Sequence, residues 1–191
     1  MISRRNSTVA LASIALAAMF TVAPAQAQDA PKVKLATSMG DIVVQLDAAK
    51  APKTVENFLA YVNSKHYDGT IFHRVIDGFM AQTGDVEHAN MENNYNPGRA
   101  GTGGSDLPDL PAEFSRLPHD RGTLGAARSM NPNSANSQFF INFKDNHFLN
   151  GQYTVYGRVI DGMEHVDKIV RGEPPANPDR MISVKVAADV A

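Results

Sequence analysis

Cysteine is absent from the 191 residues, and charge of either sign is in short supply. Without cysteine, disulfide bonds, thiolate zinc sites and a thiol nucleophile are all excluded. The 18 basic and 20 acidic side chains leave a formal charge of -2, whereas general nucleic-acid binding needs a basic excess that neutralises several phosphates. Glycine and proline are at ordinary levels and give no reason to expect disorder. The length and the 43% hydrophobic fraction suit one domain with one core.

The first 27 residues have the pattern of a cleaved secretory signal peptide. Arg4 and Arg5 precede an uncharged run from Val9 to Val22, and Ala25-Gln26-Ala27 offers small residues where a signal peptidase reads. This run of 14 residues is too short to span a hydrocarbon core of about 30 Å, so a permanent anchor is the weaker alternative. A twin-arginine signal fits less well than a general one, because polar residues follow the arginine pair. We expect cleavage near Ala27 and a periplasmic domain over residues 28–191.

Short apolar segments dominate that domain. Two β-branched segments, 33–35 and 42–46, with a turn between them predict a hairpin. Apolar residues then recur at helical spacing after Pro52, which suits a first helical turn, so we predict a helix ending near His66. Strand-sized apolar runs follow, at 70–76, 79–82, 122–127, 138–143 and 154–160.

A second short helix is predicted over 163–170, and Ile182, Val184 and Val186 alternate as a final strand. Between Val86 and Phe114 the chain is polar, without a sustained period, and is expected to be a long surface excursion. Many short strands with two helices predict a closed or nearly closed antiparallel barrel.

Two strand-sized runs carry candidate functional side chains. In the first, alternation places Arg74 on one face with Phe72 and Ile76, an unusual position for a guanidinium unless it meets a polar group. The alternative is an arginine whose aliphatic stem covers apolar surface. In the run 138–143, Phe139, Ile141 and Phe143 share one face, which we assign to the core. Phe140 lies on the other face between Gln138 and Asn142, as a binding floor or as an ordinary exposed aromatic.

Familiar catalytic and cofactor motifs are missing. The six histidines form no i, i+4 pair and no HExxH, which argues against a metal site. The serines lie in no nucleophile-elbow motif. Gly101-Thr102-Gly103-Gly104 lacks the Lys-Ser/Thr of a phosphate loop and suits a turn. We therefore expect neither a metal nor a cofactor.

Two long segments resemble signature motifs of the cyclophilin peptidyl-prolyl cis-trans isomerases. These are Phe72-His73-Arg74-Val75-Ile76-Asp77-Gly78-Phe79-Met80-Ala81-Gln82 and Ser137-Gln138-Phe139-Phe140-Ile141-Asn142. Further similarity extends over roughly residues 32 to 188, through Gly101-Thr102-Gly103-Gly104, Asp120-Arg121-Gly122-Thr123-Leu124, Phe148-Leu149-Asn150-Gly151 and Val155-Tyr156-Gly157-Arg158-Val159.

The resemblance implies a mostly β fold, a closed eight-stranded antiparallel β-barrel capped by two α-helices, with a proline site on its outer face. By position, Arg74 is the expected catalytic arginine, and Gln82 and Gln138 are expected to hydrogen-bond the substrate backbone. Around them, the resemblance assigns further substrate-binding residues, namely Phe79, Met80, Phe140 and Leu149 in the pocket, Gly101 at the neighbouring subsite, and Arg128 and Ser129 along the peptide.

The sequence departs from the better-known eukaryotic members at three places. Phe148 stands where they usually carry tryptophan and Tyr153 where they usually carry histidine, as in bacterial members. Because the family's tryptophan contributes an indole N–H to cyclosporin binding, cyclosporin is expected to bind weakly here. The stretch from Val86 to Ala100 is longer than the common pattern, so the rim near Gly101 is not predicted by analogy.

The resemblance implies an enzyme that accelerates X-Pro rotation in unfolded or newly exported polypeptides by stabilising the twisted amide without a covalent step. We expect a monomer that binds proline-containing chains, with no nucleic-acid partner and no membrane attachment after cleavage. The alternative is a proline-peptide-binding chaperone or scaffold with little turnover. A barrel that holds a small ligand inside is disfavoured because Phe139, Ile141 and Phe143 would fill that interior.

Overall fold

The computed structural model describes residues 30–187, so the expected signal peptide lies outside the described residues. The described chain is mostly β and has two short α-helices. Neither helix is long and apolar enough to cross a membrane. In chain order the elements are β1 (Lys32–Thr37), β2 (Gly40–Leu46), α1 (Pro52–Asn63), β3 (Arg74–Ile76), β4 (Met80–Thr83), β5 (Thr123–Ala126), β6 (Phe139–Asn142), a 3₁₀ turn η1 (His147–Leu149), β7 (Val155–Asp161), α2 (Met163–Val166) and β8 (Met181–Val186).

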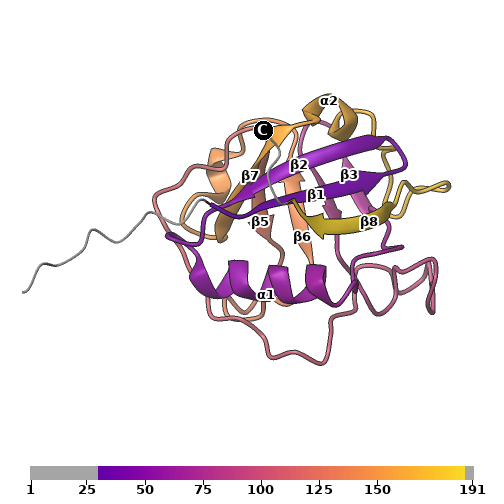
Figure 1. Ribbon diagram of the computed structural model, residues 1–191, viewed down its shortest axis with the longest axis horizontal. Coiled ribbons are helices and arrows are strands. Elements are labelled where there is room, and N and C mark those ends of the chain that lie inside the picture. Colours follow the sequence, from indigo (N-terminus) through magenta and orange to yellow (C-terminus); the bar gives the residue numbers. More distant parts are fainter. Residues whose placement is uncertain (1–29, 188–191) are drawn as a thin grey trace, which may run out of the picture.

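The eight strands form one antiparallel sheet in the order β3-β4-β6-β5-β7-β2-β1-β8. The sheet curls strongly, with α1 and α2 at opposite ends of it (Figure 1). The expected closed barrel is wrong, because no ladder between β3 and β8 is formed in the described chain. Near the two edges the chain forms isolated bridges, Ile71 with Arg180 and Val75 with Gly172. β3 is only three residues long, and it faces the loop before β8 instead of β8 itself.

The main core fills the concave side of the curled sheet. Four aromatic side chains dominate its centre, and Phe58 of α1 lies 5.2 to 5.5 Å from the rings of Tyr67, Phe139 and Tyr156. Edge-on and tilted contacts of this kind are favourable for aromatic pairs. Phe139, Ile141 and Phe143 all belong to this core, which confirms their predicted face. These three side chains occupy the interior that a ligand-carrying barrel would leave open.

Both helices are shorter than predicted. The first ends at Asn63 because Lys65 adopts a φ of 60°, in the left-handed region that a helix cannot continue through. The second is one turn, Met163–Val166. Beyond it the amides of Lys168 and Ile169 bond three residues back, so the chain tightens out of the α-helical pattern.

The last strand forms as predicted, but its burial does not follow the alternation of Ile182, Val184 and Val186. Val184 is buried, whereas Ile182 and Val186 are exposed and Met181 is buried in their place. The β1–β8 register shifts between Ala36 and Thr37, which breaks simple alternation along the strand.

Candidate active site

A second, smaller apolar cluster lies apart from the main core. Met80, Phe140 and Leu149 form its buried part. Ile76, Phe79, Ala127 and Tyr153 pack around them. The period of two along β6 explains this cluster, since Phe139 and Ile141 point into the core and Phe140 points the other way. The structure thus brings together the four side chains expected to hold a proline ring.

Phe140 forms the floor of this cluster. Its ring stacks on the buried imidazole of His119, with centroids 5.9 Å apart and planes at 18°. Tyr153 meets the same ring edge-on at 5.9 Å. Burial lowers the pKa of His119 below that of an ordinary histidine, although a hydrogen bond to the Tyr153 carbonyl opposes this, so burial favours the uncharged imidazole in this stack. His119 lies in no local sequence motif and reaches Phe140 only through the fold, so the sequence alone did not predict its role.

Arg74 begins β3 at the edge of the same surface. It is the cross-strand partner of Gln82, which is in turn the partner of Phe140. Directly opposed residues of neighbouring strands point to one face of a sheet, so the three side chains form one row across β3, β4 and β6. The predicted grouping of Arg74 with Phe72 is wrong, because the strand starts only at Arg74 and Phe72 packs in the main core.

A chain of amide hydrogen bonds extends this row toward the Gly101 segment. Gln82 Nε2 donates to Gln138 Oε1 at 2.9 Å. Gln138 Nε2 donates to the carbonyls of Gly101 and Gly103, at 3.0 and 2.7 Å. The predicted backbone-binding residues Gln82 and Gln138 are therefore connected to Gly101, the predicted residue of the neighbouring subsite, in one strip beside Arg74.

Asp85, which the sequence analysis missed, holds the Gly101 segment in place. This fully buried carboxylate accepts hydrogen bonds from the backbone N–H groups of Gly101 and Gly103, at 2.7 and 3.1 Å. Gly101 has a φ of +93°, and a Cβ there would lie 2.9 Å from His73 Cδ2. Glycine is thus required at this position by both conformation and contact.

Two of the three remaining predicted side chains, Arg128 and Phe148, contact residues at the edge of the apolar cluster. Arg128 lies 4.4 Å above the Tyr153 ring and donates to the Gln152 carbonyl. Phe148 is 64% exposed, with its ring 5.6 Å from that of Phe79. Ser129 instead hydrogen-bonds within its own turn, to Ser134.

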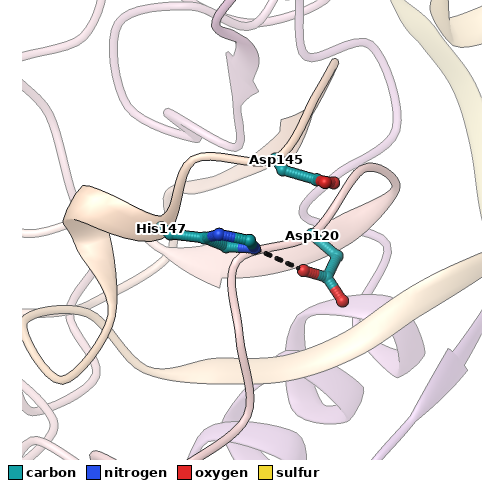
Figure 2. Close-up of side chains that lie close together, drawn as sticks. All are labelled: Asp120, Asp145 and His147. Carbon is teal, nitrogen blue, oxygen red and sulfur yellow. Dashed lines mark hydrogen bonds and ion pairs between the residues drawn. The ribbon is translucent and has the colours of Figure 1, made fainter.

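Within residues 30–187, one group of side chains could hold a metal ion. Asp120, Asp145 and His147 lie close together (Figure 2), and they offer ligand atoms within 4.8 Å of one another. His147 Nε2 already pairs with Asp120 at 2.8 Å, and Asp145 accepts the Arg121 backbone N–H. Exposed acidic groups of this kind are common without a metal, so the group by itself indicates no metal chemistry.

Comparison with known families agrees with this geometry. Residues 32–186 match the family described as cyclophilin type peptidyl-prolyl cis-trans isomerase. The chain belongs to the cyclophilin family. The match covers every strand and both helices of the described cyclophilin domain.

Two bacterial proteins illustrate the similarity of this cyclophilin to curated relatives. A probable peptidyl-prolyl cis-trans isomerase of Brucella suis biovar 1 (strain 1330) is 49% identical over 192 residues, covering 97% of each chain. Peptidyl-prolyl cis-trans isomerase B of Escherichia coli (strain K12) is 44% identical over 141 residues, covering 70% of this chain and 80% of the relative.

Solved structures of cyclophilins have the same fold. The cyclophilin AquaCyp293 from Hirschia baltica superposes with a TM-score of 0.72 at 26% identity, covering 85% of this chain and 76% of its own. A Cryptosporidium parvum cyclophilin type peptidyl-prolyl cis-trans isomerase, crystallised in the presence of the dipeptide Ala-Pro, superposes with a TM-score of 0.72 at 30% identity, covering 83% and 99%.

Proposed function

We propose that this cyclophilin catalyses cis-trans rotation of X-Pro bonds in polypeptides, with Arg74 as the catalytic arginine. The single observation that carries this assignment is the row Arg74, Gln82 and Phe140. These residues are cross-strand partners on one face. A guanidinium, an amide and an apolar floor are thereby presented together to an extended chain.

The chemistry of the row suits the reaction. Rotation about an X-Pro bond faces a barrier of about 18 to 20 kcal/mol from amide resonance, and no covalent bond has to break. The proline ring rests against Phe79, Met80, Phe140 and Leu149, while Gln82 and Gln138 bind the backbone. The Arg74 guanidinium then donates to the prolyl nitrogen as that atom becomes pyramidal.

This hydrogen bond is stronger in the twisted state than in either planar state. Each 1.36 kcal/mol of such selective stabilisation raises the rate about tenfold. Arginine suits the role because it stays charged and has fixed donors. The apolar floor also excludes water that would compete for the nitrogen lone pair.

We also propose that the substrates are unfolded or newly exported chains, met in the periplasm by a monomeric mature protein of residues 28–191. The support is the leader pattern of residues 1–27. In addition, the Brucella suis relative aligns with 97% of this chain, more than residues 28–191 alone supply. The N-terminal sequence of the mature protein from a bacterial periplasm tests this directly. We expect it to begin at Gln28, and an intact N-terminus in the cytoplasm would contradict it.

A protease-coupled prolyl-peptide assay on residues 28–191 tests the activity. We expect Arg74→Ala to lower kcat/KM at least about tenfold, with the thermal midpoint nearly unchanged, because the guanidinium acts on the transition state and not on core packing. Arg158→Ala, at an exposed position of β7, is the matched control and should retain full activity. Peptide binding without turnover in the wild-type protein would favour the scaffold alternative, and equal rates for Arg74→Ala would remove Arg74 from the mechanism.

A further inference from the structure

The Arg74 side chain has an ionic partner that lies 99 residues away in the chain. Arg74 Nε donates to Glu173 Oε2 at 3.0 Å. The two side chains are 42% and 53% exposed. An ion pair this exposed contributes little to folding stability. The contact does, however, restrict the orientation of the guanidinium.

The Glu173 carboxylate contacts Nε of Arg74 and not its terminal nitrogens. The two terminal nitrogens therefore stay available to hydrogen-bond a substrate. An arginine carries several donors in one rigid plane. Fixing Nε therefore sets the direction of the remaining donors about the Cζ atom.

The backbone places Glu173 at this position. The neighbouring residue, Gly172, exchanges two hydrogen bonds with Val75 of β3, at 2.8 and 2.9 Å. Gly172 has a φ of +149°, and a Cβ there would lie 2.6 Å from Pro175 Cα. The segment is thus attached to β3 at the residue after Arg74, in a conformation that requires glycine.

We propose that Glu173 is a positioning residue for the isomerase reaction, which holds the Arg74 guanidinium in the plane that its terminal donors need to reach the prolyl nitrogen. A partly exposed arginine samples many rotamers, and a transition-state donor is effective only when it is oriented before the reaction. The carboxylate removes this freedom without occupying the reactive donors. This inference rests on the proposed function of Arg74.

Turnover by Glu173 variants tests the role. We expect Glu173→Ala to lower kcat about tenfold with KM little changed, because a misplaced donor weakens the transition state more than the bound substrate. Glu173→Gln, whose amide oxygen still accepts from Nε, should retain most of the activity. A loss of equal size in both variants would overturn the positioning role.

A double-mutant cycle shows whether Glu173 acts through Arg74. In an Arg74→Ala background, Glu173→Ala should cause no further loss, since the group that it orients is gone. Independent, multiplicative losses would contradict the proposal.

Asp77→Ala is the matched control. Asp77 forms the other ion pair between these segments, with Arg171 Nε at 3.2 Å. We expect Asp77→Ala to keep wild-type kcat. A loss of kcat comparable to that of Glu173→Ala would mean that activity depends on how the segment around Glu173 packs against β3, and not on the orientation of the Arg74 guanidinium. That result would overturn the proposal.

An NMR measurement separates this inference from the proposed function. The Nε–Hε signal of Arg74 should be protected and sharp in the wild-type protein, and shifted and exchange-broadened in Glu173→Ala. An unchanged signal would overturn the positioning role even if the protein is an active isomerase. A wild-type protein without turnover would refute the proposed function, whatever the Arg74 signal shows.

Discussion

The Phe140 ring lies directly over Gly125 of the neighbouring strand. The two residues are cross-strand partners in the β5–β6 ladder. A Cβ added to Gly125 would come within 2.6 Å of Phe140 Cε2, closer than real Cβ atoms approach a ring. The floor of the proline pocket therefore depends on the absence of a side chain beneath it.

We expect Gly125→Val to tilt Phe140 out of its position and to lower kcat/KM about tenfold, since small displacements in a site have large effects on rate. Overpacking of this kind also costs about 1 to 3 kcal/mol of stability. The prolyl-peptide assay and a denaturant titration measure the two effects. Gly98→Ala is the control, because its new Cβ would meet only Asn96 Oδ1 at 3.5 Å. Wild-type turnover in Gly125→Val would contradict the prediction, because it would show that catalysis does not depend on the position of the Phe140 ring.

Phe139→Ala should affect the folding stability of the protein more than its catalysis. Phe139 is 1% exposed and contacts Phe58 and Tyr67 in the main core, so its truncation should lower the free energy of unfolding by about 3 to 5 kcal/mol. Phe148→Ala, at a 64% exposed position, should change it by less than about 0.5 kcal/mol. Urea denaturation of both variants provides the comparison. A stable but inactive Phe139→Ala protein would contradict the assignment of that ring to the core.

Phe148→Trp should strengthen cyclosporin binding. Phenylalanine keeps the apolar wall beside Phe79 but has no donor, and a lost hydrogen bond to a buried acceptor costs about 1 to 3 kcal/mol, or roughly 5- to 150-fold in affinity. Peptide turnover should change little, because the proposed proline pocket rests mainly on Phe79, Met80, Phe140 and Leu149. Inhibition titrations of both proteins under one condition measure this. Tight inhibition of the unmodified protein by cyclosporin would contradict this prediction, and so would an unchanged affinity in Phe148→Trp. Either result would mean that another feature near the pocket controls cyclosporin binding.

Stability should fall as the pH is lowered through the range in which histidine titrates. His73 is 3% exposed, and burial lowers its pKa, while nearby Asp85 partly opposes the shift. In the unfolded chain a histidine has its ordinary pKa of about 6.5. The unfolded chain therefore binds protons more readily than the native protein. Stability is therefore fully present above about pH 6.5 and is lost toward more acidic pH.

Urea midpoints at several pH values measure this loss. His73→Phe removes one of the titrating groups and should flatten the decline between about pH 7.5 and pH 5.5. His119, whose pKa is also lowered by burial, should account for part of the remaining slope. An identical decline in wild type and His73→Phe would contradict a contribution from His73.

The sequence by itself determined the strands and the two faces of β6. Alternation at 138–143 separates Phe139 and Ile141 from Phe140 because successive strand residues point to opposite sides, which is a local property of the backbone. The family motifs likewise predicted Arg74, Gln82 and the pocket residues Phe79, Met80 and Phe140, since these stand at fixed places in two continuous segments, and Leu149 came from a third, shorter one.

Only the tertiary structure decided the contacts between distant segments. Whether the sheet closes depends on how the short β3 meets the loop before β8, and here that loop bonds to β3 through Gly172. The buried Asp85 beneath Gly101, His119 behind Phe140 and Glu173 beside Arg74 are pairs separated by 16 to 99 residues. Local periodicity carries no information about such pairs, because they arise from the packing of the whole sheet and its loops.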